Sequence, residues 1–327
     1  MVFLFKDKSF IGVFFLILLC FAVHSHLFIG VPIVPNTEAS GVISFVLSKY
    51  IALLQPTIIG LLYIAIVLLQ AIRLNILLNE YRMFTQSGFT TAMAYILLTG
   101  VFADWSFITP ALIGNTFVIW LFIQVSKLYN NPSPKSLLFN TGLIVGAAIL
   151  CYQPTALLIV IVLFALAIVR PFIISEWFVL LLGAIMPFYI IGSILFLNNN
   201  FHLFTSFLPH ITLGLPIIKI DVWFWVNMGI ITILLLSGFI ILNKNTNRMV
   251  IQTRKNWGVI IVMAIIMIPV PFLFLKADIA GAALSIVPFA AIISNIFVYP
   301  KKMWLPNILF WLTSIAIIHN NWLLIKN

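Results

Sequence analysis

The sequence predicts an all-α fold: a polytopic helical membrane protein with about eleven transmembrane helices, built as a single transmembrane domain over residues 1–327 without a soluble domain. Of its residues, 63% are hydrophobic and 7% are charged, whereas soluble domains have about 25% charged residues. Apolar runs of about 15 to 22 residues recur along the chain, and a helix needs about 20 residues to cross a bilayer. This composition excludes a water-soluble fold, and no nucleic-acid-binding motif is present.

Polar or proline-containing breaks divide the apolar runs into eleven predicted spans. The first span follows Lys6 and Lys8 and has no small-x-small cleavage pattern after it, so it is predicted to stay uncleaved. Three of the spans are short, which predicts that one of them is tilted or re-entrant. The stretch Ser40–Ala52 mixes apolar and polar residues and predicts a helix lying on the membrane surface. The predicted spans are residues 9–29, 53–72, 88–103, 108–128, 137–152, 154–169, 177–197, 222–242, 257–275, 279–298 and 304–323.

Basic residues divide unevenly between the loops when the chain is threaded alternately across a bilayer with its N-terminus inside. Lys and Arg accumulate in cytoplasmic loops, and thirteen of the seventeen fall on the inner side. An error of one span would move every later loop to the wrong side. The pattern therefore predicts a multi-pass protein of the bacterial inner membrane with a cytoplasmic N-terminus. The inner residues are Lys6, Lys8, Arg73, Arg82, Lys127, Lys135, Arg170, Lys244, Arg248, Arg254, Lys255, Lys301 and Lys302.

Charged side chains are costly inside hydrocarbon and mark ion pathways where they occur there. The seventeen basic and seven acidic residues all fall in predicted loops or at predicted span ends, which disfavours a proton- or sodium-coupled transporter. Glu176 is predicted to form a solvated pair with cytoplasmic basic residues. Trp120 and Trp311 fall in the middle of predicted spans and are predicted to pack between helices.

Glu38 and Asp104 are the two carboxylates that the sequence singles out for chemistry. Glu38 lies in the first predicted outer loop and Asp104 in the short second outer loop, so both belong to the same membrane boundary. If folding brings them together, one can act as a general base while the other orients a phosphate or holds a divalent metal. The structural alternative is that Asp104 caps the following helix and that Glu38 keeps a loop hydrated.

The histidines add candidate binding residues at the same boundary. His24, His26, His202 and His210 map to the outer side together with His319, and a histidine cluster can bind metal or carry protons near neutral pH. On a continuous helix His24 and His26 would point about 200° apart, so both reach one ligand only if the helix ends there. The alternative is a set of unrelated interfacial histidines.

Two lysines near the same predicted surface share a Lys-x-Asp spacing. Lys219 precedes Asp221, and Lys276 precedes Asp278. Both lysines are candidates for contact with a lipid phosphate. Ordinary ion pairing within the loops is the alternative.

Five segments in chain order carry a resemblance to a known family. Their arrangement over most of residues 1–200 resembles an uncharacterised family of polytopic inner-membrane proteins of Bacteroidota. The same region is similar, more distantly, to the integral-membrane glycosyltransferases of the fold-C superfamily. The segments are Phe102–Trp105, Pro132–Lys135, Thr141–Ala148, Cys151–Pro154 and Arg170–Phe172.

The second resemblance implies a substrate class and two site residues. Fold-C glycosyltransferases use polyprenyl-phosphate sugars, with one acidic residue in the first outer loop near the acceptor and often another between the third and fourth spans. Glu38 and Asp104 occupy those two places in this chain. The chain departs from the pattern in having no Asp-x-Asp pair and one carboxylate in the first loop, which leaves a non-catalytic relative open.

Two functional predictions result. In the first, a sugar passes from a lipid-phosphate donor to an acceptor at the periplasmic face, and the partners are membrane lipids, polyprenyl-phosphate sugars among them. Glu38 is then the base, and Asp104 orients the donor phosphate or a divalent metal. In the second, the protein is a non-enzymatic carrier, flippase or envelope assembly factor. Its inward cavity would be lined by proline-kinked helices and by polar groups such as Asn140, Thr141, Gln153 and Asn227.

Overall fold

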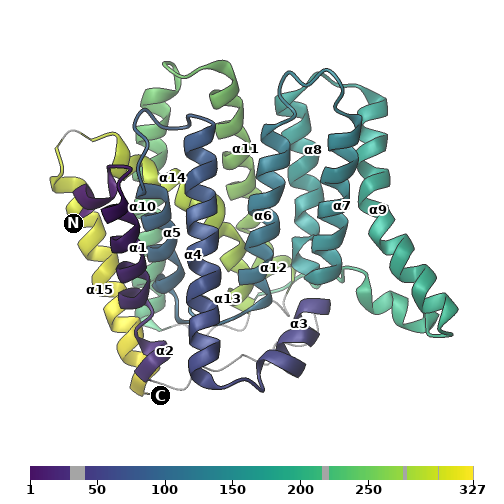
Figure 1. Cartoon of the computed structure of the whole chain (residues 1–327), viewed down its shortest axis with the longest axis horizontal. Helices are drawn as coiled ribbons and strands as arrows, with labels where there is room; N and C mark the ends of the chain where they lie inside the picture. Colours follow the sequence, from purple (N-terminus) through teal and green to yellow (C-terminus); the bar gives the residue numbers. More distant parts are fainter. Residues whose placement is uncertain (30–40, 216–220, 275–277, 301, 327) are drawn as a thin grey trace.

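The structure is a computed structural model that describes residues 1–29, 41–215, 221–274, 278–300 and 302–326. This part of the chain is helical with no β-strand, which confirms the predicted all-α class. The longer helices stand side by side, so their connections gather at two opposite ends (Figure 1). These helices are α1 (Phe10–Val23), α4 (Pro56–Glu80), α5 (Thr90–Val101), α6 (Pro110–Ser126), α7 (Lys135–Cys151), α8 (Leu157–Val169), α9 (Ile174–Leu197), α10 (Val222–Thr246), α11 (Ile251–Met267), α14 (Ile286–Val298) and α15 (Trp304–Lys326).

Short helical turns connect or extend the longer helices. Several of them reflect a proline or a change in helix type within one apolar run, which explains why helical segments are more numerous than predicted spans. The short α-helices are α2 (His26–Ile29), α3 (Val42–Val46), α12 (Val270–Leu273) and α13 (Asp278–Gly281). The other turns are η1 (Val2–Phe5), η2 (Leu47–Ile51), η3 (Ala103–Trp105), η4 (Gln153–Ala156), η5 (Phe201–Phe207) and η7 (Ala282–Ser285).

The two ends of the bundle differ in charge and in histidine content. One end, here the basic end, carries the N-terminal turn and the α4–α5, α6–α7, α8–α9, α10–α11 and α14–α15 connections (Figure 1). The opposite end, here the histidine end, carries α2, α3, the α5–α6 turn, η5 and the last turns of α15. These are the two sets of loops that the charge pattern assigns to opposite sides of a membrane. Which compartment each end faces stays a prediction.

Five segments in the described chain are long and apolar enough to cross a membrane. The remaining helices that match predicted spans include shorter ones of 10 to 17 residues, so the number of crossings stays a prediction. The five segments are Pro56–Glu80, Ile174–Leu197, Val222–Thr246, Ile251–Leu273 and Ile279–Val298.

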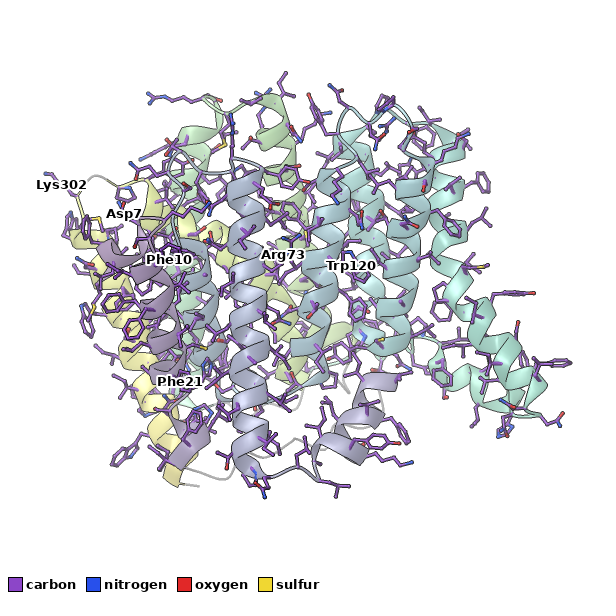
Figure 2. The ribbon with its side chains drawn as sticks, viewed as in Figure 1. Asp7, Phe10, Phe21, Arg73, Trp120 and Lys302 are labelled. Atoms are coloured by element: carbon purple, nitrogen blue, oxygen red, sulfur yellow. The ribbon has the colours of Figure 1, made fainter. Side chains whose placement is uncertain are left out.

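Helix α4 continues beyond the predicted end of its span, and this changes the position of one charge. Arg73 was expected in a loop, but it lies within α4, two turns before Glu80. Figure 2 shows it on the half of α4 nearer the basic end. Its side chain is exposed, so its long apolar stem can lie along the helix while the guanidinium reaches the head-group layer.

Helices α5 and α14 form the centre of the bundle and pack against each other. All of α5 and all of α14 are buried. Small and hydroxylated residues on α5, such as Thr91, Ala92 and Gly100, allow neighbouring helices to approach on every side. A helix that is covered all round in this way belongs to the protein interior rather than to the lipid-facing surface.

Helices α7 and α9 pack backbone to backbone through glycines. A Cβ atom on Gly142 would collide with the Leu180 carbonyl oxygen and lie 2.7 Å from the Ala184 nitrogen. One turn later, a Cβ on Gly146 would lie 2.9 Å from the Pro187 ring. Gly142-x-x-x-Gly146 is therefore a small-xxx-small contact of the kind that stabilises helix pairs in membranes.

Arg170, in the α8–α9 connection, links the first turn of α9 to the α6–α7 connection at the basic end. Its Nε and Nη2 donate to the two Glu176 carboxylate oxygens at 3.0 and 3.1 Å, and Nη1 donates to the carbonyls of Leu128 and Asn131 at 3.1 and 2.8 Å. Glu176 is 4% exposed. The prediction of a solvated Glu176 pair is therefore wrong, because the bidentate fork of Arg170 allows the carboxylate to be buried.

Two tryptophans in the middle of apolar helices lie on the surface instead of between helices. Trp120 on α6 and Trp311 on α15 are 48% and 51% exposed, and Figure 2 labels Trp120. The packing prediction is wrong for both, because an apolar surrounding removes the penalty for an outward aromatic side chain. Trp311 instead lines a surface groove described below.

Helix α3 and η2 fill the range of the predicted surface helix and lie at the histidine end. Gly41, which precedes α3, has a φ of 132° and leaves no room for a Cβ next to the Cys151 carbonyl. Glycine adopts this conformation at little cost. The chain therefore approaches the end of α7 closely before α3 begins.

Candidate functional site

The break between α1 and α2 brings the first two predicted histidines together. Helix α1 ends at Val23, His24 is its C-cap, and α2 begins at His26. Both histidines are buried, and their ring centroids lie 6.3 Å apart. Because the helix ends between His24 and His26, both imidazole rings can face the same region of the protein.

His24 connects three helices and the α5–α6 turn. The Cys20 carbonyl lies 3.0 Å from His24 Nδ1 and only accepts, which assigns the proton of a neutral ring to Nδ1. Nε2 lies 3.2 Å from the hydroxyls of both Tyr63 and Thr99. The Tyr63 hydroxyl donates its one hydrogen to the Trp105 carbonyl at 2.9 Å. His24 is therefore part of a buried hydrogen-bond network that holds the turn next to Asp104.

Asparagines at the end of α15 complete this polar cluster. Asn321 Oδ1 accepts from His26 Nδ1 at 2.8 Å, and Asn321 Nδ2 donates to the Val23 carbonyl at 2.8 Å. Asn320 Nδ2 donates to the Val101 carbonyl at the end of α5, and Asn227 Nδ2 on α10 donates to Asn320 Oδ1 at 3.5 Å. His26 Nε2 and Asn227 Oδ1 are buried without a hydrogen-bond partner, so the cluster retains two positions for further polar groups. We call these residues the histidine-end cluster: His24, His26, Tyr63, Thr99, Asn227, Asn320 and Asn321.

Asp104 lies next to this cluster, in η3, and is exposed. It does not cap α6, because Thr109 is the N-cap and its hydroxyl accepts from Leu112 N at 3.2 Å. The capping alternative for Asp104 is therefore wrong. Its neighbours hold the turn in place: Phe102 packs on Phe224 of α10 at 5.6 Å, and Trp105 Nε1 donates to the Ile279 carbonyl at 3.0 Å.

A surface groove of about 480 Å³ runs between α10 and α15. Its lining is apolar apart from Asn307, whose Oδ1 is buried without a hydrogen-bond partner. The Trp223 ring, which lines the groove, stacks on His319 at 3.6 Å. The groove therefore reaches the histidine end beside Asn320. Its lining residues are Trp223, Val226, Ile230, Asn307, Ile308, Trp311, Leu312, Ile315 and Ala316.

The sequence did not reveal this groove. Its residues come from two helices about eighty positions apart in the chain, and each residue alone is ordinary for an apolar span. The local signals are two tryptophans, Trp223 and Trp311, and one asparagine, Asn307, which stands within an apolar stretch of the sequence. Only the contact between α10 and α15 turns these residues into one surface.

The other predicted site residues are separate or lie outside the described residues. His202 on η5 and His210 after it are exposed, and η5 lies on the opposite side of the bundle from α1 and α2 (Figure 1). The structure therefore does not bring them to His24 and His26. Glu38, Lys219 and Lys276 lie outside the described residues. Among the described residues, no three His, Cys, Asp or Glu side chains are grouped so that they could hold a metal ion.

The polar groups named for an inward cavity also lie apart from one another. Asn140 is exposed, Thr141 donates to its own helix at Leu137 O, and Gln153 donates to Ser206 O. Asn227 belongs to the histidine-end cluster. None of these four residues lines the groove between α10 and α15.

The fold and the site define an all-helical protein with several helices suited to cross a membrane. Comparison of the chain with protein-family models, with curated proteins and with solved structures finds no match. The site must therefore be interpreted from its own geometry.

Proposed function

We propose that this protein binds a lipid-linked substrate with its apolar chain in the α10–α15 groove and its head group at the histidine end. The observation that carries the proposal is the groove itself. Its volume of about 480 Å³ lies within the range of small-molecule sites, which are mostly apolar with a few polar groups that fix orientation. The groove opens to the surface that would face lipid, so a substrate can enter from the bilayer.

The position of Asp104 supports a reaction at the head group. The Phe102–Phe224 contact places the Asp104 turn beside the start of α10, where Trp223 and His319 mark the end of the groove. A head group leaving the groove here would meet the exposed Asp104 carboxylate and the histidine-end cluster. Carboxylates at such a boundary can bind a phosphate-bound metal or act as a base.

The specific reaction that we propose is transfer of a sugar from a polyprenyl-phosphate donor to an acceptor. Asp104 orients the donor phosphate or a divalent metal, and Glu38 is the base. The proposal also puts the histidine end on the periplasmic side of a bacterial inner membrane, with the N-terminus in the cytoplasm, because the basic end has the loops rich in Lys and Arg. The fold-C resemblance of Glu38 and Asp104 supports this choice.

A tryptophan in place of Ile315 is expected to block lipid binding. Ile315 lines the groove and is 61% exposed, so the larger ring can fill the groove without disturbing the core. Polyprenyl phosphate should bind about tenfold more weakly, since filling the groove removes apolar contact area. Native mass spectrometry of the protein in nanodiscs containing polyprenyl phosphate measures this. Ile318→Trp is the matched control, because Ile318 is 65% exposed on the same helix and outside the groove. Equal binding by both variants would contradict the groove proposal.

Asp104→Asn is expected to lower turnover by about 10²-fold or more while lipid binding is retained, because a neutral amide no longer holds the metal that would stabilise the charge of the donor phosphate. The measurement is the level of lipid-linked sugars and of their glycan products in cells carrying the variant. Asp221→Asn is the control at the same end, because Asn replaces Asp well at the N-cap of α10. Unchanged pools in Asp104→Asn cells, with lipid binding still blocked by Ile315→Trp, would reject sugar transfer and leave a lipid carrier.

A further inference from the structure

A second pocket lies at the basic end, on the side of the bundle opposite to the histidine-end cluster. Its volume is about 460 Å³. It is formed by the α4–α5 loop, by the α10–α11 loop with the first turn of α11, and by Tyr299 at the end of α14. Its lining residues are Glu80, Tyr81, Arg82, Met83, Phe84, Thr85, Arg248, Met249, Val250, Gln252, Thr253 and Tyr299.

Side chains of α4 and α11 hold the α4–α5 loop, which forms one wall of this pocket, in place. Asn75 Nδ2 donates to the Gly88 carbonyl at 2.9 Å, and Trp257 Nε1 donates to the Met83 carbonyl at 3.3 Å. Phe84 packs edge to face on Trp257 at 5.6 Å. A wall fixed in this way loses little entropy when a ligand binds.

Two arginines from different loops supply the charge of the pocket. Arg82 and Arg248 are both exposed, and neither forms an ion pair with a carboxylate among the residues that the structure describes. Glu80 is the one acidic residue in the lining, so the lining keeps a net positive charge. Arg82 also has a left-handed φ of 48° directly after α4, a position where glycine is usual. The chain has an arginine there instead, which favours a role for its side chain.

Hydroxyl donors accompany the arginines. Burial and the charge of Glu80 raise the pKa of the Tyr81 hydroxyl, and burial raises the pKa of Tyr299. Both hydroxyls therefore keep their protons at neutral pH and can donate to an anion. Guanidinium groups together with neutral hydroxyls are the donors that bind phosphate oxygens well.

We propose that this basic-end pocket binds a phosphate group through Arg82 and Arg248. Two sources share this chemistry: the head group of an anionic phospholipid in the adjoining leaflet and a soluble phosphate compound. The pocket and the α10–α15 groove belong to opposite ends of the bundle, so either proposal can fail without the other.

The test uses the full-length protein and the double variant Arg82→Gln/Arg248→Gln. Native mass spectrometry counts phosphatidylglycerol retained after extraction from nanodiscs of phosphatidylglycerol and phosphatidylcholine. Calorimetry on the detergent-solubilised protein measures binding of inorganic phosphate and pyrophosphate. The matched control is Lys244→Gln/Arg254→Gln, which removes two exposed charges at the same end but outside the pocket.

We expect the pocket variant to bind its anion about tenfold more weakly, because it loses charge-assisted hydrogen bonds, and the control to bind as the original protein does. Loss confined to phosphatidylglycerol identifies the lipid source, and loss confined to phosphate or pyrophosphate identifies the soluble source. Absence of binding by the original protein, or equal loss in both double variants, overturns the proposal. If the double variant fails to fold, Arg82→Lys serves in its place. It keeps the charge without the guanidinium fork and should bind the anion several-fold more weakly.

Discussion

We expect Gly142→Leu to prevent α7 and α9 from packing and to leave little folded protein. The Cβ alone would meet the Leu180 carbonyl and, at 2.7 Å, the Ala184 nitrogen. These are backbone atoms of α9, which cannot rotate away as a side chain can. Overpacking typically costs about 1–3 kcal/mol, and a clash against backbone should reach at least about 3 kcal/mol. The fraction of monodisperse protein after detergent extraction, followed against temperature, measures the effect.

Gly229→Leu is the control for this prediction. A Cβ on Gly229 of α10 meets nothing within 4 Å, so the same substitution adds apolar surface towards lipid and replaces a weak helix former. It should leave the thermal midpoint unchanged or raise it. Equal thermal midpoints for Gly142→Leu and Gly229→Leu would contradict the close backbone contact between α7 and α9.

The second large effect is expected for Arg170→Met. Methionine keeps much of the volume but leaves the Glu176 carboxylate buried without its partner, since the side chains of Arg170 and Glu176 are 13% and 5% exposed. Breaking a buried pair by removing one partner costs about 3–5 kcal/mol. The carbonyls of Leu128 and Asn131 also lose their donor. Unfolding in mixed detergent micelles, with intrinsic tryptophan fluorescence as the signal, gives the free energy.

A double substitution separates the charge from the packing. Arg170→Met/Glu176→Leu removes both charges, and replacing a whole buried pair by apolar residues is often close to neutral. The double variant should therefore recover most of the stability that Arg170→Met loses. Arg254→Met is the exposed control and should change the free energy of unfolding by less than about 0.5 kcal/mol. A double variant as unstable as Arg170→Met would show that the lost carbonyl contacts, and not the buried charge, decide the effect.

The helical segments follow from the sequence because each one depends on local properties. An apolar run about 20 residues long is stable in lipid only as a helix, which satisfies its own backbone. Prolines then set starts such as those of α4 at Pro56 and α6 at Pro110. The predicted span ends at residue 72 because Arg73 and the polar residues after it resemble a break, whereas α4 continues to Glu80. The polar side chains of α4 find partners inside the protein: Gln70 donates to Leu112 O on α6, and Asn75 donates to Gly88 O in the α4–α5 loop.

The candidate site was predictable only in part. His24 and His26 are singled out by residue type, but the helix break that orients them falls inside the predicted span 9–29 and was not predicted. Asn320 and Asn321 carry no comparable signal, because their roles depend on which helices α15 contacts. His202 and His210 have the same residue type but lie on exposed η5. Histidine content alone therefore did not distinguish a cluster from isolated side chains.

Composition and charge order by themselves determined the helical class, the approximate segment boundaries and the separation of a basic end from a histidine end. These properties depend on hydrophobicity and on loops close in sequence, which a single chain displays directly. Only the tertiary structure decided which helices and side chains contact one another. These contacts include Gly142 with α9, Arg170 with the buried Glu176, and α10 with α15 at the groove. In an apolar solvent hydrophobicity no longer marks the interior, so shape complementarity and polar contacts between helices determine which faces meet.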